Sequence, residues 1–215
     1  DDAAGLSISE KMRSQIRGLN KASDNAQDGI SLIQVAEGAL NETHSILQRM
    51  NELATQAAND TNTSVDRQSI KDEIEQLNEE LDRISSTTQF NKQDLLTGKF
   101  SGKLQVGALE GQTMDLKIST AVSSTELKVK DIKVSTNENA GKAMKSIQDA
   151  IESVSKQRSK LGAIQNRLEH TINNLDTNAE NTQAAESRIR DTDMADEMVQ
   201  YSKNNILSQA GQSML

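Results

Sequence analysis

The residues that could do chemistry in this chain are two histidines and three acidic pairs. His44 and His170 each lie in a segment of helical periodicity, with no second histidine and no cysteine at the spacing of a metal site. The acidic candidates are the pairs Asp1 and Asp2, Glu79 and Glu80, and Asp191 and Asp193. Paired carboxyls serve as acid and base where an apolar pocket keeps one of them protonated, and no segment predicts such a pocket. We therefore interpret the histidines as surface residues and the pairs as solvated helix faces and caps.

Motifs for nucleotide binding and hydrolysis are also missing. The glycines stand singly or in turns without a GxGxxG or P-loop pattern, and no HExxH or supported Ser, His and Asp grouping occurs. The seven methionines fall mostly at helical spacing, which indicates packing along helix seams rather than a soft-metal site. The sequence predicts a protein that is not an enzyme, with no catalytic residues, no cofactor and no metal.

Composition favours a thin, elongated helical protein. Aromatic residues are 1% of the 215 residues, proline, tryptophan and cysteine are absent, and the formal net charge is -8. Contact with phosphates needs a stripe of Lys and Arg, and the basic residues here look scattered along the chain, so we expect no nucleic-acid partner. No apolar run approaches the roughly 20 residues that span a bilayer, and no visible signal segment starts the chain, so we expect no membrane contact.

A long apolar stripe predicts one uninterrupted helix at the start of the chain. From Leu6 to Ala57, apolar and small residues recur in alternating steps of three and four, the spacing of one helix face. The stripe comprises Leu19, Ala22, Ala26, Ile30, Ile33, Ala36, Leu40, Thr43, Leu47, Met50, Ala54 and Ala57. Such a helix would be roughly 75 to 85 Å long and needs partner helices to cover its stripe.

Two further helices can supply that cover. The polar run 59–64 reads as a turn ending in an N-cap, and helical spacing from Ile70 to Ile84 then predicts a short returning helix that frays at 85–88. A second long stripe runs from about Ala140 to Ala179. We therefore expect three main helices packed along coiled-coil-like seams.

Between Phe90 and Ser135 the apolar period changes to two. Alternation around Leu104 and again from Met114 to Ile118 predicts a β-hairpin. A phase shift within residues 127–134 predicts a third strand with a β-bulge near Lys130 and Asp131.

The predicted fold is mostly α: an elongated antiparallel rod of long helices, with a small β-hairpin region inserted between its two halves. Four segments are expected. They are amino-terminal rod helices at 1–89, a short β region at the outer end of the rod at 90–137, a carboxy-terminal rod helix at 138–180, and a tail at 181–215 that partners are needed to order.

One small feature departs from the seam pattern. Arg49 and Leu53 lie four apart on one helix face, displaced by about 100° from the seam residues Met50 and Ala54. Leu53 is therefore predicted to be partly exposed beside a cation.

Six segments of the sequence resemble bacterial flagellin. In the first half they are DDAAGL at 1–6, GISLIQVAEGALNE at 29–42 and LQRMNELATQAAN at 47–59. In the second half they are LGAIQNRLEHTINNL at 161–175, ESRIRDTDMADEM at 186–198 and NNILSQAGQSML at 204–215. The segments occur in the family's order and spacing, across roughly the first 90 and last 60 residues.

The resemblance implies a secreted, self-assembling structural subunit of the extracellular flagellar filament, which serves motility. Its partners would be other flagellin subunits, and an export chaperone is a further possible partner. The family's terminal segments, which line the inner tube of the filament, are not matched in full, so we expect this chain by itself to be monomeric. Two alternatives remain open: a hook-filament junction protein, and a cytoplasmic coiled-coil adaptor or signalling bundle.

The resemblance also implies recognition by Toll-like receptor 5. Matching the family's LQRxxEL motif and its glutamate on the returning helix, residue by residue, gives Gln48, Arg49, Leu53 and Glu73 as receptor-binding residues. Two positions depart from the usual pattern: Asn51 stands where an arginine is often found, and Lys92 replaces a glycine. We expect the first departure to weaken receptor affinity and the second to change a turn.

Overall fold

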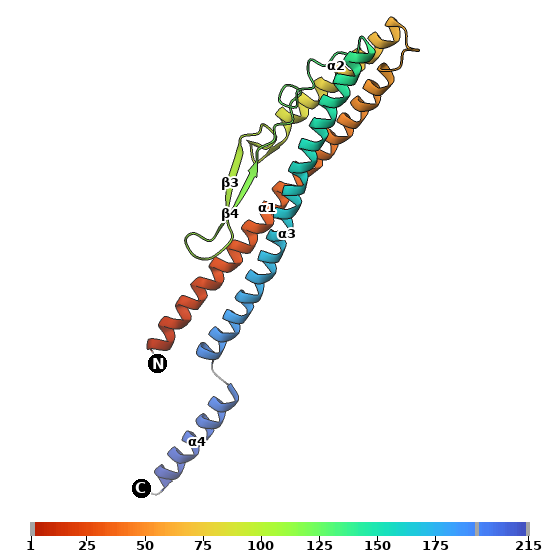
Figure 1. The fold of residues 1–215 in the computed structure, drawn as a ribbon. Coiled ribbons are helices and arrows are strands. Elements are labelled where there is room, and N and C mark those ends of the chain that lie inside the picture. Colours follow the sequence, from red (N-terminus) through yellow and green to blue (C-terminus); the bar gives the residue numbers. More distant parts are fainter. Residues whose placement is uncertain (1–2, 192–193, 214–215) are drawn as a thin grey trace.

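The structure is a computed structural model that describes residues 3–191 and 194–213 (Figure 1). Two long antiparallel helices form a rod: α1 is Ala3–Ala57 and α3 is Asn137–Arg190, with 55 and 54 residues. A helix rises 1.5 Å per residue, so each is about 80 Å long. The long first helix and the antiparallel rod expected from the sequence are thus confirmed.

The rod is held together by a seam of aliphatic and alanine side chains between α1 and α3. The buried seam residues of α1 include Ala26, Ile33, Ala36, Leu40, Leu47, Met50 and Ala54, and those of α3 include Ala143, Ile147, Ala150, Val154, Leu161 and Leu168. Alanines bring the two backbones close, and the larger aliphatics fill the space between them. Toward the one end of the rod where α1 begins and α3 ends, Leu19 and Ala22 pack with Leu175 and Ala179 in a separate cluster.

The returning helix α2, Ser64–Thr87, begins with a capping box. The Asp66 backbone N–H donates to Thr63 Oγ1 at 3.3 Å, and the Thr63 backbone N–H donates to Asp66 Oδ2 at 2.8 Å. These bonds satisfy two amides that have no partner within the helix. The Thr63 amide, together with the Thr63 hydroxyl, which also bonds Asp66 Oδ2, holds the pKa of Asp66 below its ordinary value. The N-cap predicted within the polar run is confirmed. The helix extends through Thr87, because the hydroxyls at 86–88 donate back to the carbonyls of Arg83 and Ile84.

Two small antiparallel sheets follow. β1 (Gln89–Phe90) pairs with β2 (Gln93–Asp94), and β3 (Phe100–Gln105) pairs with β4 (Thr113–Ile118). On β4, Met114, Leu116 and Ile118 are buried and the alternate residues are exposed, so the predicted hairpin and its alternation are confirmed.

The β3–β4 hairpin lies along the flank of α1, rather than at the outer end of the rod where the sequence analysis placed it (Figure 1). Asn25 Nδ2 donates to the Gln105 carbonyl at 3.1 Å. Gly29 makes the close approach possible, since a Cβ there would come within 2.4 Å of Leu104 Cδ1. The hairpin is anchored by these side-on contacts, which sequence periodicity does not reveal.

The predicted third strand and its bulge are wrong. Residues 119–135, here called the return segment, form turns and irregular backbone without a strand. The amides of Val129 and Lys130 both donate to the Ser124 carbonyl, and Lys128 has a left-handed φ of 59°. Asp82 of α2 accepts from the Ser124 amide at 2.8 Å and from its hydroxyl at 2.9 Å. Because local and helix contacts satisfy these groups, none is left to form a ladder.

The return segment fills the groove between α2 and α3. Its buried side chains are Val122, Ser124, Leu127, Val129 and Val134. Asn78 of α2 donates to the Val129 carbonyl, and Gln157 of α3 is bonded to Thr120. The three-helix cross-section therefore extends only as far as α2 reaches, and beyond it α1 and α3 pack as a pair flanked by the hairpin.

α3 continues to Arg190, past residue 180 where the sequence analysis ended the rod helix. Ser9 Oγ donates to Glu186 Oε1 at 2.6 Å, and Arg190 lies 3.5 Å from Glu10. These contacts with α1 keep residues 181–190 in the rod, so the predicted tail begins too early. The final helix, α4, is Met194–Ser213.

The turn between β1 and β2 carries a testable strain. Asn91 and Lys92 have φ values of 49° and 63°, the left-handed region that a two-residue hairpin turn requires and that glycine adopts best. We predict that Lys92→Gly raises the free energy of unfolding in urea by about 0.5 to 1 kcal/mol. The matched change Lys103→Gly, inside β3, should instead lower it by a similar amount. A loss of stability in Lys92→Gly would contradict the assignment of strain.

Candidate functional site

The residues considered for chemistry do not converge. His44 lies on α1 with its Nε2 3.0 Å from Gln48 Nε2, and His170 is exposed on α3. A hydrogen bond from Arg83 holds the pKa of Glu80 below its ordinary value, so this carboxyl is unsuited to donate a proton. Within residues 3–191 and 194–213 no group of three or more His, Cys, Asp or Glu could hold a metal ion. Asp1, Asp2 and Asp193, members of two acidic pairs, lie outside the described residues.

The predicted receptor-binding residues lie where α1 and α2 run side by side. Arg49 of α1 reaches across to α2, where its Nε donates to Glu73 Oε1 at 2.8 Å and its Nη2 lies 2.8 Å from the same oxygen. Its Nη1 donates to Glu52 Oε2 at 3.2 Å. The structure thus brings together Arg49 and Glu73, which are 24 residues apart in the sequence.

Arg49 is an organised but accessible cation. The hydrogen bond to Glu73 and the weaker one to Glu52 raise its pKa above the ordinary value, so it stays charged. Half of its side-chain surface is exposed, at 50%, as is 44% of that of Glu73. A guanidinium has five N–H donors and the two glutamates engage three of its nitrogens, which leaves donors for a second protein.

Leu53 does not lie on that surface. It is 2% exposed and belongs to the main core, so the prediction of a partly exposed leucine is wrong. The buried stripe of α1 is wider around Leu53 than near the amino-terminal end of the helix, because α2 covers a second face of α1 around Leu53. Leu53 stabilises the contact that carries Arg49 and Glu73 rather than presenting an apolar surface of its own.

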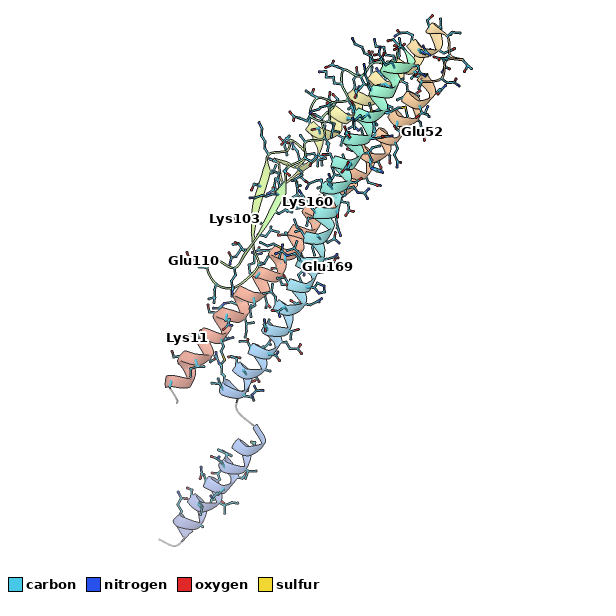
Figure 2. All side chains as sticks on the ribbon, in the orientation of Figure 1. Lys11, Glu52, Lys103, Glu110, Lys160 and Glu169 are labelled. Carbon is cyan, nitrogen blue, oxygen red and sulfur yellow. The ribbon has the colours of Figure 1, made fainter. Side chains whose placement is uncertain are left out.

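The other residues on this flank are polar. Gln48 is exposed and lies beside His44, while Asn51 is only half-buried and adds little to the exposed surface. Glu52, exposed on α1 (Figure 2), was missed by the sequence analysis, although its spacing of three from Arg49 is that of a helical ion pair. We define the Arg49 flank as Gln48, Arg49, Glu52 and Glu73. Its chemistry suits recognition of a polar protein surface.

A second candidate surface is the apolar row of α4. Met198, Val199, Ile206 and Leu207 are 58–67% exposed and line a shallow groove with Ser202 and Lys203. In the described part of the chain nothing covers them. Several aliphatics on one amphipathic helix are the usual means of docking into another protein's groove. In the same described ranges, no helix is long and apolar enough to cross a membrane.

Because Leu53 is buried and Arg49 is half-exposed, substitutions at these two residues should affect stability differently. Leu53→Ala should lower the free energy of unfolding by about 2 to 5 kcal/mol, since it opens a cavity between α1 and α2. Arg49→Ala should leave the urea midpoint close to that of the unaltered chain, because its ion pairs are half-exposed and screened. Equal losses from the two changes would contradict the separation of core from flank.

Comparison with known proteins agrees with this architecture. Residues 1–101 match the family model "Bacterial flagellin N-terminal helical region", and residues 144–215 match "Bacterial flagellin C-terminal helical region". The chain is 57% identical to a flagellin of Halalkalibacterium halodurans over 219 residues, a match that covers all of this chain and 80% of the relative.

Solved structures share the fold. The crystal structure of Bacillus cereus flagellin superposes with a TM-score of 0.63 at 32% identity, covering 76% of this chain and 94% of that one. A putative flagellar hook-associated protein from Vibrio parahaemolyticus reaches a TM-score of 0.72 at 13% identity, covering 87% and 98%. At that identity the second likeness concerns the fold alone.

Proposed function

We propose, from the premise that this chain belongs to the bacterial flagellin family and is a structural subunit of the flagellar filament, that its rod has two distinct protein-binding roles. The first is packing against other subunits in a secreted, extracellular filament that serves motility. The second is recognition of the Arg49 flank by Toll-like receptor 5. The protein is not an enzyme, and both roles depend on contact rather than on reaction.

The long α1–α3 seam is the observation that supports the structural role. Both helices bury one face against each other and leave polar faces along about 80 Å of rod for lateral neighbours. The exposed apolar row of α4 is the complementary feature, because it provides a hydrophobic contact for other subunits. During export the same row is suited to a flagellin chaperone, which would cover it before assembly.

The accessible cation at Arg49 supports the receptor role. Interface energy is commonly concentrated in an arginine whose geometry is already organised, and Arg49 is held by Glu73 and Glu52 while half-exposed. Leu53 acts in this proposal as support beneath the flank, not as a contact.

The fold shared with the Vibrio protein does not by itself separate a filament subunit from the hook-filament junction alternative. Whole-chain identity of 57% to a flagellin favours the filament subunit instead. The same identity to a flagellin counts against the cytoplasmic adaptor alternative.

Assembly is tested with a chimera in which this chain replaces the matched part of the Halalkalibacterium halodurans flagellin. We predict long regular filaments by negative-stain electron microscopy under conditions where the parent flagellin polymerises. Discrete particles from the folded chimera, beside filaments from the parent, would contradict the structural role and favour a junction protein.

Receptor recognition is tested by Arg49→Ala in a reporter assay for Toll-like receptor 5. We predict that the half-maximal concentration rises about 10- to 100-fold, because a central arginine contact is lost. Arg13→Ala, an exposed arginine paired with Glu10 elsewhere on α1, is the matched control and should leave the response unchanged. An unchanged dose-response for folded Arg49→Ala would remove the receptor proposal and leave the filament role intact.

A further inference from the structure

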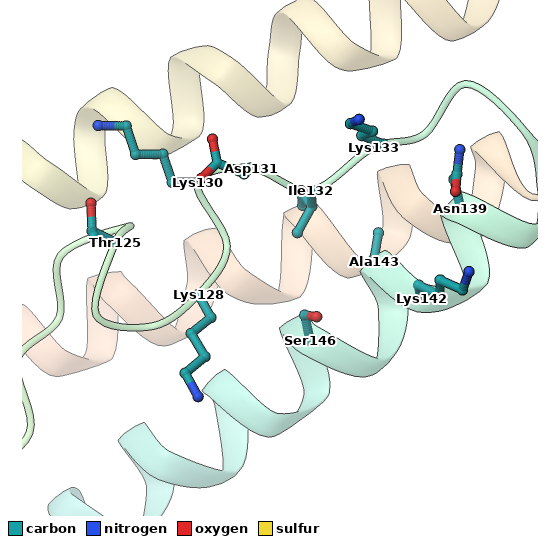
Figure 3. Close-up of a pocket in the computed structure, with 10 residues that line it drawn as sticks. All are labelled: Thr125, Lys128, Lys130, Asp131, Ile132, Lys133, Asn139, Lys142, Ala143 and Ser146. Atoms are coloured by element: carbon teal, nitrogen blue, oxygen red, sulfur yellow. The ribbon is translucent and has the colours of Figure 1, made fainter.

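The fold places a local run of lysines in the return segment beside basic residues of α2 and α3. A groove of about 440 Å³ between the return segment and α3 is lined by Lys128, Lys130, Lys133 and Lys142, with Asp131 as the one carboxylate among its lining residues (Figure 3). A second groove of about 430 Å³, between the return segment and α2, is lined by Lys133 with Arg67 and Lys71. Lys133 lines both. We call the three lysines of the return segment, 128, 130 and 133, the cationic strip.

The charge of this strip is not neutralised within the chain. Among the described residues, no carboxylate forms an ion pair with Lys128, Lys130 or Lys133, whereas neighbouring cations are paired. Lys142 binds Glu138, Lys71 binds Glu75 and Arg67 binds Asp60. In a chain of formal net charge -8, three adjacent unpaired ammonium groups form a local positive region.

The backbone holds the strip in place. Leu127, Val129 and Val134 point into the core and alternate with the exposed lysines. The Val129 carbonyl accepts from Asn78 Nδ2 at 3.2 Å, and both Val129 and Lys130 donate to the Ser124 carbonyl. The strip therefore presents its charge on a fixed scaffold, which lowers the entropic cost of binding an acidic surface.

The chain also carries a matching acidic surface. Residues 72–83 of α2 hold six carboxylates and a single cation, Arg83. Three of these carboxylates are taken up internally, because Glu73 binds Arg49, Glu80 binds Arg83 and Asp82 binds Ser124. The other three, Asp72, Glu75 and Glu79, are exposed, and we call them the acidic row. Within it, Glu75 forms a half-exposed ion pair with Lys71, and Asp72 accepts a hydrogen bond from Gln68. In the described structure no ion pair joins the acidic row to the strip of the same molecule.

We propose that in the filament the cationic strip of one subunit contacts the acidic row on α2 of the next. The proposal rests on the structural role above and names the surfaces that carry it. Copies of this chain, each of net charge -8, repel one another, so close lateral packing needs opposite charges to be placed together. A contact between two different patches is heterologous and propagates without closing, as a filament requires. A second copy is favoured over a free polyanion because this chain itself supplies the complementary carboxylates.

Charge reversal in the Halalkalibacterium halodurans chimera tests the contact. One variant carries Lys128→Glu, Lys130→Glu and Lys133→Glu, a second carries Asp72→Lys, Glu75→Lys and Glu79→Lys, and a third combines all six. We predict that each triple raises the critical concentration for assembly about tenfold or more, and that the six-fold variant restores it. The defect of the first triple should shrink in about 1 M salt, where the Debye length is about 3 Å.

The matched control reverses three exposed lysines outside the rod helices, at 99, 103 and 117, of which Lys103 is labelled in Figure 2. This control makes the same change in net charge as the variant of the cationic strip. Its critical concentration for assembly should be nearly that of the unaltered chimera. Circular dichroism checks that every variant is folded.

Several results would overturn the pairing while the unaltered chimera still forms filaments. These are normal assembly of both triples, a defect that the six-fold variant does not repair, or an equal defect in the control. A strip variant that assembles normally but no longer binds dextran sulfate would assign the strip to a polyanion instead. Failure of the unaltered chimera to form filaments would contradict the structural role itself.

Discussion

The antiparallel packing of α1 against α3 is the constraint on which the rest of the structure depends. A helix of 55 residues with few aromatics gains little stability in isolation and needs a partner along its stripe. Alanines at 26, 36, 54, 143 and 150 let the two backbones approach, and Ile33, Leu40, Leu47, Ile147 and Leu161 fill the seam. Once this pair is formed, α2, the hairpin and the return segment each have a surface to pack on.

The binding surfaces proposed for this molecule lie on the outside of that seam. A flank such as the one at Arg49 needs a cation that is held but not buried, and the α1–α2 junction provides it through Glu73 and Glu52. Buried residues beneath it, such as Leu53, keep the geometry rigid without entering the contact. The same division applies to the return segment, whose apolar residues anchor the lysines that face solvent. A structural subunit can thus expose several protein-binding surfaces while sharing one core.

Local sequence patterns were enough to predict the long helices, an N-cap within the polar run 59–64 and the β3–β4 hairpin, because each depends on neighbours in sequence. Local patterns failed to predict the environment of residues that contact elements distant in the sequence. Leu53 was expected to be partly exposed because the sequence of α1 alone does not show where α2 lies. Residues 127–134 alternate like a strand, but Ser124 and Asp82 satisfy the groups that a ladder would use. The lysines of the cationic strip lie close together in the sequence, but only the fold shows that they border Arg67 and Lys71 of α2.

Native-state hydrogen exchange tests the central claim most directly, namely that α1 and α3 form one cooperative seam. The account predicts that backbone amides within residues 26–54 and 140–168 exchange together, at the free energy of global unfolding. The amides of α4, whose described side chains are exposed, should exchange far sooner. Exchange of the α1 amides well before those of α3, or independently of them, would contradict the account, because each helix would then be stable or unstable without the other.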